Sequence, residues 1–306
     1  MNFKTLIITF SQTGYTRKSA EQIRDGIVPV TGQCDLEDLA NVEPGFLQEY
    51  DLVGLGCPVF YYQEPFHVRD FVEELPDQKG RHWFVFCSHG SAVGITLHSL
   101  SAHLKDSGAH LVGHFDIYAD ACAPFIPYPT FTTGHPDEID YQRARAFGRE
   151  VAERTERFLA GDSPIVPYPR PPEEGWVRSA RMFRPEVMKR MVPSLRINRE
   201  KCTLCGECEE NCPVKGIDAQ AEPPRIQDPC IYCFRCVMVC PVLAIEADWT
   251  GMVANNPAHY ARLRKWLDEA AERGEFRWRV DPDSIDFNDY MHKQRERALE
   301  RNTKKV

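Results

Sequence analysis

The residues that most clearly carry chemistry are eight cysteines in the second half of the chain. They form two runs with the same spacing, C-x2-C-x2-C-x3-C-P. The first run contains Cys202, Cys205, Cys208, Cys212 and Pro213, and the second contains Cys230, Cys233, Cys236, Cys240 and Pro241. Cysteine thiolates bind zinc and iron–sulfur clusters, and gaps of two residues let neighbouring thiolates reach one metal centre. The spacing therefore predicts that both runs bind metal.

This repeated run resembles that of bacterial ferredoxins, in which the fourth cysteine of each run ligates the other cluster. The resemblance implies two [4Fe-4S] clusters. One would be held by Cys202, Cys205, Cys208 and Cys240, and the other by Cys230, Cys233, Cys236 and Cys212. Zinc sites and a disulfide framework are the alternatives. Zinc sites usually show two well-separated C-x2-C pairs, and a disulfide framework requires a secreted chain, so we favour the clusters.

Composition narrows the class of protein. The chain has 306 residues, 42% of them hydrophobic and 27% charged, which is ordinary for a globular protein. Its 45 acidic and 37 basic residues give a net charge of −8, which argues against a general nucleic-acid binder. The first ten residues are too short an apolar run for a signal peptide, and no stretch is long enough to span a membrane. Because such clusters need a reducing compartment, we expect a cytoplasmic protein.

The N-terminal half alternates between apolar runs and amphipathic helix patterns. The runs are residues 6–10, 33–39 (the weakest), 50–55, 83–86 and 111–118. Short continuous apolar runs of this kind are typical of buried parallel strands. The alternation predicts an α/β fold with a five-stranded, doubly wound parallel sheet, in which ligands bind outside the carboxyl ends of the strands.

A hydroxyl-rich turn follows the first predicted strand. It contains Ser11, Gln12, Thr13, Gly14, Tyr15 and Thr16 and precedes a helix pattern. Backbone N–H groups at a helix start, together with hydroxyls, are suited to a phosphate group, which here would be held by neutral donors. An ordinary N-capped turn is the alternative. The turn lacks the G-x4-GK-[ST] pattern of nucleotide hydrolases.

This turn and the segments after the third and fourth strands resemble the three flavin-binding loops of flavodoxins. Residues 1–160 fit the flavodoxin fold, and the whole chain resembles flavodoxin–ferredoxin fusion proteins of anaerobic electron transport. The resemblance implies FMN, with its phosphate at residues 11–16. It implies flavin-ring contacts from Pro58, Val59, Phe60 and Tyr61 on one side and from Ser88, His89 and Gly90 on the other.

Many flavodoxins have a Tyr-Gly-Gly-type sequence after the fourth strand, where this chain has Ser88, His89 and Gly90. The role of His89 is therefore an open question. This histidine would either donate to a flavin carbonyl and assist proton transfer or be a water-exposed loop histidine, and both interpretations stay open. We expect Cys34, Cys57, Cys87 and Cys122 to be buried and inert.

The rest of the chain divides into three predicted segments. Residues 161–196 form a proline-rich, basic connector; residues 197–250 form a small α+β ferredoxin domain; and residues 251–306 form a helical extension. In the extension, Asn256 is expected to cap a helix that begins with Pro257 and ends at Gly274. The Pro- and aromatic-rich loop 119–136 is either a flap over the flavin or a packing loop.

The leading hypothesis is an intracellular electron-transfer protein. It would relay low-potential electrons among FMN, two clusters and a redox partner such as a ferredoxin, a flavoenzyme or an acceptor reductase, as a carrier or as a subunit of a complex. The alternative is a self-contained reductase of a quinone or an activated organic acid, with His89 as the catalytic residue. A cluster-based sensor or assembly module is a third hypothesis. Because no G-x-G-x-x-G follows a strand, a dedicated dinucleotide fold is not expected.

Overall fold

The computed structural model describes residues 3–303, which form two compact units. Unit 1 contains the residues up to Ala119 and Gly134–Arg181, and unit 2 contains Asp120–Thr133 and the residues from Met182 onward. The chain therefore passes between the units three times. The division into four segments along the sequence stays a prediction.

Unit 1 is built on a five-stranded parallel sheet. Its strands are β1 (Thr5–Thr9), β2 (Asp35–Asp38), β3 (Leu52–Pro58), β4 (His82–His89) and β5 (His110–Tyr118). Their spatial order is β2-β1-β3-β4-β5, and every neighbouring pair is parallel. This is the flavodoxin-like order, whose direction reverses between β1 and β3. The predicted fold class is confirmed, although β3 and β4 run farther toward their carboxyl ends than their apolar runs indicated.

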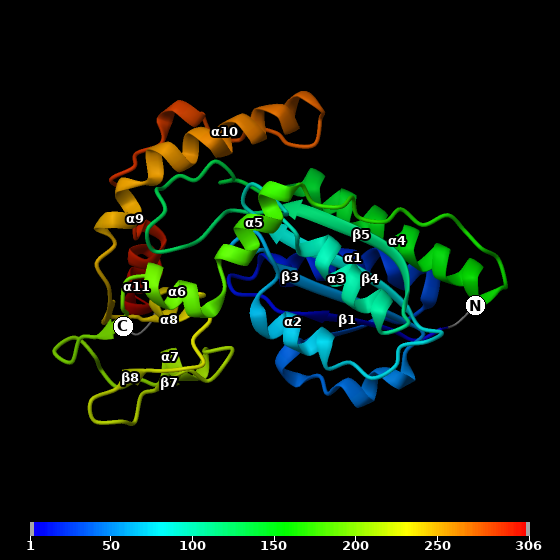
Figure 1. Ribbon diagram of the computed structural model, residues 1–306, viewed down its shortest axis with the longest axis horizontal. Coiled ribbons are helices and arrows are strands. Elements are labelled where there is room, and N and C mark those ends of the chain that lie inside the picture. The colour runs from blue at the N-terminus through cyan, green and yellow to red at the C-terminus, as the bar shows by residue number, and fades with distance from the viewer. Residues whose placement is uncertain (1–2, 304–306) are drawn as a thin grey trace. The chain divides into compact units, whose positions relative to one another are not determined.

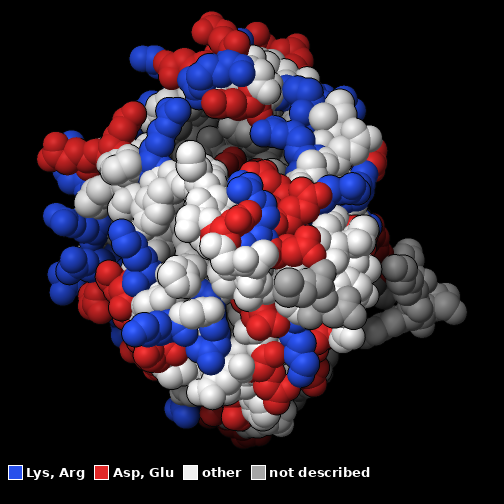
Figure 2. All heavy atoms as spheres, turned by 90° about the vertical axis from the view of Figure 1, so that its right-hand side faces the viewer, with Lys and Arg blue, Asp and Glu red and all other residues white. Residues whose placement is uncertain are grey.

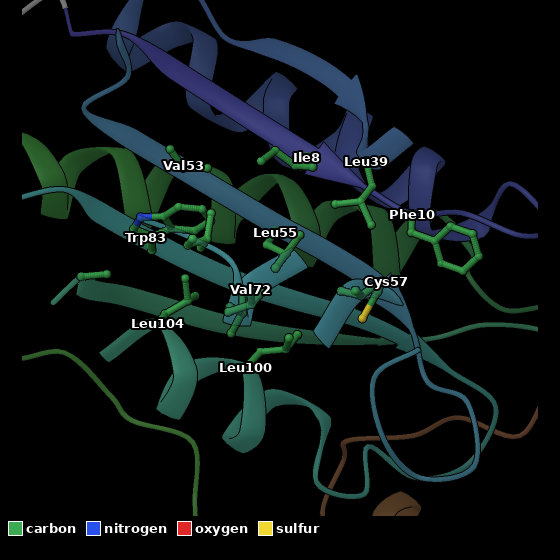
Figure 3. Packing of buried hydrophobic residues seen from close by; sticks show 14 of the residues in the cluster. Ile8, Phe10, Leu39, Val53, Leu55, Cys57, Val72, Trp83, Leu100 and Leu104 are labelled. Atoms are coloured by element: carbon green, nitrogen blue, oxygen red, sulfur yellow. The ribbon is translucent and has the colours of Figure 1, made fainter. Parts of the chain in front are cut away.

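Helices cover both faces of this sheet (Figure 1). They are α1 (Tyr15–Thr31), α2 (Phe66–Glu73), α3 (Thr96–Asp106) and α4 (Glu138–Leu159), with the short 3-10 turns η1 (Leu39–Asn41) and η2 (Pro44–Glu49) before β3. One apolar core joins the sheet to α2 and α3, and Figure 3 shows Val72, Leu100 and Leu104 from these helices lying against strand residues. The second core lies on the side of α1 and α4. Side chains of successive strand residues thus alternate between two buried faces.

Glycines on β3 make room for two phenylalanines on β4. Gly54 pairs with Phe84 and Gly56 with Phe86 in the strand register. A Cβ atom at Gly54 would lie 2.1 Å from the Phe84 ring, and one at Gly56 would lie 2.0 Å from the Phe86 ring. Both rings are fully buried. These large rings fill the α1/α4 face because β3 has no side chains at the facing positions.

Two further glycines let α1 and α4 touch backbone to backbone. A Cβ atom at Gly26 would lie 1.9 Å from the carbonyl oxygen of Arg145, and one at Gly148 would lie 2.0 Å from that of Ile23. Neither carbonyl belongs to a flexible side chain that could move away. The spacing between α1 and α4 therefore depends on these glycines.

Substituting Gly148 with alanine tests this packing. Alanine at an exposed helix position gains up to about 1 kcal/mol over glycine, whereas overpacking costs roughly 1–3 kcal/mol. We expect Gly148→Ala to lower the free energy of unfolding of unit 1, measured by urea denaturation. Gly175→Ala is the control, because Gly175 lies in a helix and its Cβ would meet nothing within 4 Å. An equal or higher stability for Gly148→Ala would contradict the close contact.

The connector is extended only in its first part. Residues 162–173 contain no helix or strand, but α5 (Glu174–Met182) and α6 (Pro185–Met191) follow. Pro185 is tolerated because it occupies the first turn of α6, where its missing N–H would have no helical partner. Within unit 1, the Tyr168 ring packs against His98 and lies under the Lys105 ammonium of α3. Residues 162–181 therefore form a strap that belongs to unit 1 and packs onto α3.

Unit 2 has little regular sheet. β6 (Arg196–Ile197) pairs with β9 (Ile245–Glu246), and β7 (Ile217–Asp218) pairs with β8 (Arg225–Ile226), both antiparallel. Two short helices, α7 (Glu207–Glu210) and α8 (Arg235–Val239), contain the third cysteine of each run, Cys208 and Cys236. The C-terminal part contains α9 (Thr250–Ala254), α10 (Asn256–Glu272), η3 (Pro282–Ser284) and α11 (His292–Thr303). A small α+β region followed by a helical tail is what the sequence predicted.

The expected cap of α10 is wrong by one residue. Asn255 is the capping residue, and Asn256 is already helical. The Asn256 side chain instead donates a 2.7 Å hydrogen bond to the carbonyl oxygen of Phe125. Its amide is therefore used to hold the loop that contains Phe125. The end of α10 is as predicted, since Gly274 follows it with a φ of +72°.

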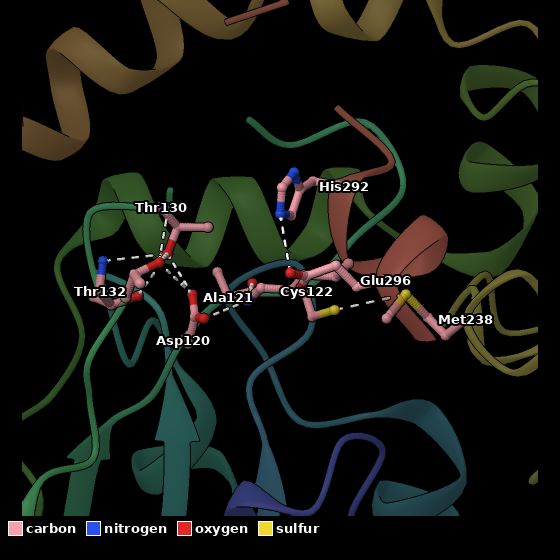
Figure 4. A network of polar contacts seen from close by, with 10 residues as sticks. Asp120, Ala121, Cys122, Thr130, Thr132, Met238, His292 and Glu296 are labelled. Atoms are coloured by element: carbon pink, nitrogen blue, oxygen red, sulfur yellow. Dashed lines mark hydrogen bonds and ion pairs between the residues drawn. The ribbon is translucent and has the colours of Figure 1, made fainter. Parts of the chain in front are cut away.

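The loop Asp120–Thr133 packs within unit 2 (Figure 4). The Asp120 carboxylate accepts hydrogen bonds from the hydroxyls of Thr130 (2.6 Å) and Thr133 (3.0 Å) and pairs with the Lys293 ammonium at 2.5 Å. The Tyr128 ring stacks on His292 with centroids 4.0 Å apart. These contacts favour the interpretation of this segment as a packing loop, which the C-terminal extension holds in place.

The charged side chains on one face of the surface are mixed in sign, and the helices are not of the membrane-spanning kind in the part of the chain that the structure describes. On the face shown in Figure 2, basic and acidic side chains are interspersed among uncharged ones. Within the part of the chain that the structure describes, no helix is both long and apolar enough to cross a membrane.

Candidate functional site

The turn after β1 is built around a glycine that no other residue type would replace without strain. Gly14 has a φ of +97° and precedes the first residue of α1. The Ser11 hydroxyl accepts a 3.2 Å hydrogen bond from the backbone N–H of Arg17, which closes the turn over the helix start. Gln12 and Thr16 are buried, whereas Ser11, Thr13 and Tyr15 are half-buried. Hydroxyls and the positive end of α1 thus meet at one edge of the sheet.

The segment after β3 makes a tight turn with two tyrosines at its centre. Phe60 and Gln63 exchange backbone hydrogen bonds of 2.9 and 3.0 Å. Between them, Tyr61 and Tyr62 have φ values of +52° and +66°. Two consecutive left-handed residues define a type I′ turn, which normally takes glycine or asparagine. Tyrosines in this conformation store backbone strain of the kind that clusters at ligand sites.

Contacts on two sides hold this strained turn. The carbonyl oxygen of Tyr62 accepts a 2.8 Å hydrogen bond from the N–H of Ile95, and a Cβ atom at Gly94 would lie 1.9 Å from that oxygen. From α5, the Trp176 ring lies 4.8 Å from the Tyr62 ring, and the carbonyl of Ala180 accepts a hydrogen bond from the Gln63 amide. The strap therefore positions a predicted flavin loop.

Hydrogen bonds through Ser88 join all three predicted flavin loops. The N–H of Val59 donates to the carbonyl oxygen of Ser88 at 2.9 Å. The Ser88 hydroxyl lies 2.8 Å from that of Thr16, and both side chains are buried. The segments containing residues 11–16, 58–61 and 88–90 therefore meet at the carboxyl ends of β1, β3 and β4. In this fold class, this edge is where ligands bind.

His89 is a buried residue of β4, so its interpretation as a water-exposed loop histidine is wrong. Its Nε2 atom lies 3.0 Å from an Asp116 carboxylate oxygen on the neighbouring strand. Its Nδ1 atom is buried and has no hydrogen-bond partner among the described residues. Despite the opposing effect of burial, the hydrogen bond and charge of His89 hold the pKa of Asp116 below its usual value. The pair can hold a proton at this end of the sheet. A single acidic residue within the apolar β5 run was the available signal for Asp116.

Glu64 is a buried acid that the sequence analysis missed. It follows the Tyr61–Tyr62 turn and is fully buried. One carboxylate oxygen accepts hydrogen bonds from Arg69 at 2.6 Å and Ser99 at 2.8 Å. These bonds tie the end of the turn to α2 and α3. Sequence spacing does not reveal them, because Ser99 lies 35 residues away.

The cysteines of unit 1 are buried as expected. Cys57 and Cys87 are fully inaccessible, and burial, helped by the charges of Glu64 and Asp116 respectively, raises their pKa values well above normal. Burial raises the pKa of Cys34 to about 12. Cys122, in unit 2, is only half-buried, and its thiol lies 3.6 Å from the Met238 sulfur. A raised pKa keeps a thiol protonated and unreactive at neutral pH.

In unit 2, the two cysteine runs have matching backbones. Left-handed residues recur at equivalent positions: Leu204 and Tyr232 (φ +56° and +54°), Gly206 and Phe234 (+79° and +59°), and Lys215 and Leu243 (+55° and +52°). Only one of these six is a glycine, so this conformation is imposed by the site and not by residue preference. The two runs therefore follow the same backbone path.

Backbone N–H groups point at the thiols in both runs. Gly216 donates to the Cys212 sulfur at 3.2 Å, and Ala244 donates to the Cys240 sulfur at 3.1 Å, four residues along in each case. Tyr232 donates to the Cys230 sulfur at 3.4 Å. Such bonds favour the thiolate form and are known to tune cluster potentials.

The thiols fall into two neighbourhoods that cross between the runs, and Cys208 also contributes, after burial, to the raised pKa of Cys236 in the other neighbourhood. Burial raises the pKa of Cys208 to about 11, with further contributions from the nearby thiols of Cys240 and Cys205. Burial likewise raises the pKa of Cys233 to about 12, with contributions from Cys230 and Cys212. The fourth cysteine of each run therefore lies close to the other run.

Within residues 3–303, no three or more His, Cys, Asp or Glu side chains gather as they would around one metal ion. A four-iron cluster spreads its four thiolates farther apart than a single ion does. The donor set, all thiolates with backbone N–H support, suits iron–sulfur clusters.

Known proteins match the two parts of the chain separately. The family model of the 4Fe-4S dicluster domain matches residues 194–241. The chain joins a flavodoxin-like fold to an iron–sulfur domain. An uncharacterized protein of Methanocaldococcus jannaschii is 22% identical over 144 residues, which cover 44% of this chain and 89% of that protein.

Two solved flavodoxins are similar over half of the chain. One, from the domain Archaea, is 20% identical with a TM-score of 0.43 and covers 50% of this chain and 99% of its own. The other, flavodoxin 2 of Bacillus cereus, is 22% identical with a TM-score of 0.40 and covers 49% of this chain and 99% of its own. The fold assignment itself depends on the strand order of unit 1. Together with the iron–sulfur domain, it indicates an electron-transfer protein in general terms.

Thiol labelling tests the burial of the unit 1 cysteines. In the native protein at neutral pH, we expect iodoacetamide to leave Cys57 and Cys87 unmodified, as determined by peptide mass mapping, whereas denatured protein is labelled at both. Because the pKa of each thiol is raised, any labelling should keep increasing above about pH 10, where an ordinary thiol is almost fully ionised. Rapid modification at pH 7 would show that these strand ends are open.

Proposed function

We propose that this chain relays electrons among FMN, two [4Fe-4S] clusters and a partner redox protein. The observation that carries the proposal is the presence, in one chain, of a flavodoxin-type ligand edge and two matching thiol loops. When bound, FMN exchanges two electrons and can release them singly, whereas each cluster exchanges one. Because the clusters would require a reducing compartment, we propose that the protein is cytoplasmic.

The residues at the edge of unit 1 fit FMN. Ser11, Thr13 and Thr16 supply hydroxyls for its phosphate, and the start of α1 supplies a positive dipole without any lysine or arginine in the loop. The aromatic turn at Phe60 and Tyr61 offers ring faces for stacking against the isoalloxazine. We assign the phosphate to residues 11–16 and the ring to residues 58–61 and 88–90.

The residues of unit 2 fit two clusters, with the fourth ligand exchanged between the runs. Cys202, Cys205, Cys208 and Cys240 would hold the first cluster. Cys230, Cys233, Cys236 and Cys212 would hold the second. The crossed thiol neighbourhoods support this assignment.

Double substitutions test the crossed assignment. Cys205→Ala with Cys240→Ala should damage a single cluster, so about four irons per chain should remain. Cys205→Ala with Cys212→Ala should damage both clusters and leave almost no iron. Iron analysis and low-temperature EPR of anaerobically purified protein would measure this. The reverse pattern would mean that each run holds its own cluster.

A self-contained reductase is the second candidate, and the His89–Asp116 pair favours it. A buried imidazole held by a carboxylate can deliver a proton when a flavin or a small substrate such as a quinone is reduced. In this hypothesis, the clusters supply the electrons and His89 is the catalytic residue.

Anaerobic mixing separates the two candidates. The reconstituted protein, with its FMN and iron content measured, would be mixed in turn with NADH, NADPH and reduced ferredoxin while its absorbance is followed. Bleaching by reduced ferredoxin alone is expected for the relay. Bleaching by a nicotinamide within seconds would favour the reductase, and absence of a flavin band would overturn the FMN assignment.

A further inference from the structure

We propose that the Leu204–Cys205 edge of the first cysteine run is the docking surface for a one-electron redox protein with a positively charged rim. This inference rests on the proposed clusters and adds which of them exchanges electrons with the partner. It follows from a difference between two runs whose backbones otherwise match.

The first run is more exposed than the second. Of the eight cysteines, Cys205 alone is exposed, whereas Cys236 and Cys240 are buried. Leu204, next to Cys205, is 62% exposed, whereas its counterpart Tyr232 is only half-buried. A cluster ligated by Cys205 therefore lies directly beneath the surface.

The C-terminal extension and the loop Asp120–Thr133 cover the second run. Met238, in α8, is 2% exposed; its sulfur lies 2.8 Å from the Gln294 amide of α11 and 3.6 Å from the Cys122 thiol. The Phe234 ring packs edge-on against Phe125 and Trp249. The equivalent helix of the first run, α7, has no fully buried residue. The first run is therefore the more accessible of the two to a partner.

Leu204 is an apolar residue at an exposed position. It combines a left-handed backbone with an exposed, branched apolar side chain, and asparagine or glycine would suit both features better. An exposed apolar residue beside a redox centre is suited to the dry centre of a small, transient interface.

The charges around Leu204 are mainly acidic. Residues 199–210 contain four acids (Glu200, Glu207, Glu209 and Glu210) and two bases (Arg199 and Lys201). Lys201 is already paired with Glu246 at 2.8 Å. A partner that surrounds an apolar contact with lysines or arginines is the complement of this surface, and charge attraction would speed its encounter.

The chemical step at this surface is the transfer of one electron. The cluster held by Cys202, Cys205, Cys208 and Cys240 would give one electron to the partner's oxidised centre, and no atom or bond would be exchanged. An exposed ligand shortens the distance over which the electron must pass.

Mitochondrial cytochrome c, a basic one-electron protein, is a suitable probe. Its redox-inert zinc-substituted form would be titrated anaerobically against the iron-loaded protein by calorimetry at low salt. We expect Leu204→Lys to weaken binding about tenfold, because it removes the apolar contact and repels the probe. Ile165→Lys is the control, since Ile165 is 93% exposed on unit 1.

A second pair of variants tests the charges. Glu210→Gln should weaken binding about twofold at low salt, with the difference disappearing at high salt. Glu272→Gln, an exposed neutralisation on α10, should change nothing. The rate at which the dithionite-reduced protein reduces native cytochrome c should fall in parallel for Leu204→Lys and Glu210→Gln.

The outcomes separate this inference from the proposed function. Wild-type protein without iron would overturn the proposed function itself. Iron-loaded protein that fails to bind the probe, or binds it equally well as Leu204→Lys and Ile165→Lys, would overturn the docking surface only. If Leu204→Lys fails to assemble its iron, Leu204→Asn replaces it, because asparagine accepts the left-handed backbone and still removes the apolar contact.

Discussion

The winding of the two cysteine runs in unit 2 depends on buried thiols that stay protonated at neutral pH unless a metal binds them. Burial raises the pKa values of Cys208 and Cys233 to about 11 and 12, so at neutral pH the metal-free thiols stay protonated. Its strands are only two residues long, which leaves little sheet to stabilise the winding of the cysteine runs. Metal ligation would deprotonate the thiols and supply folding free energy. The left-handed residues repeated in both runs are the backbone cost of bringing the thiols together.

In unit 1, the site depends instead on a rigid sheet. Parallel pairing brings the ends of β1, β3 and β4 to one edge, and Ser88 bonds to the loops on either side of it. The strained Tyr61–Tyr62 turn persists because Gly94 and Ile95 hold it from one side and α5 from the other. The strap is therefore part of unit 1, and the contact between the Trp176 and Tyr62 rings joins it to the predicted flavin loop.

Segments far apart in the sequence build unit 2 together. The loop Asp120–Thr133 leaves the end of β5, yet its Asp120 pairs with Lys293 near the C-terminus. The same extension covers α8 and so leaves the first cysteine run as the more accessible one. The residues after position 250 therefore have a structural role, because they help to cover α8 and hold the loop Asp120–Thr133.

The sequence by itself determined the sheet, the cysteine runs and the loop at residues 11–16, because strand periodicity, thiol spacing and glycine placement are local properties. It did not determine the burial of His89, the cap of α10, or the partners Asp116 and Glu64. Nor did it show that Cys205 is exposed while the matching run is covered. These features arise from contacts between residues tens to hundreds of positions apart, which only the tertiary structure brings together.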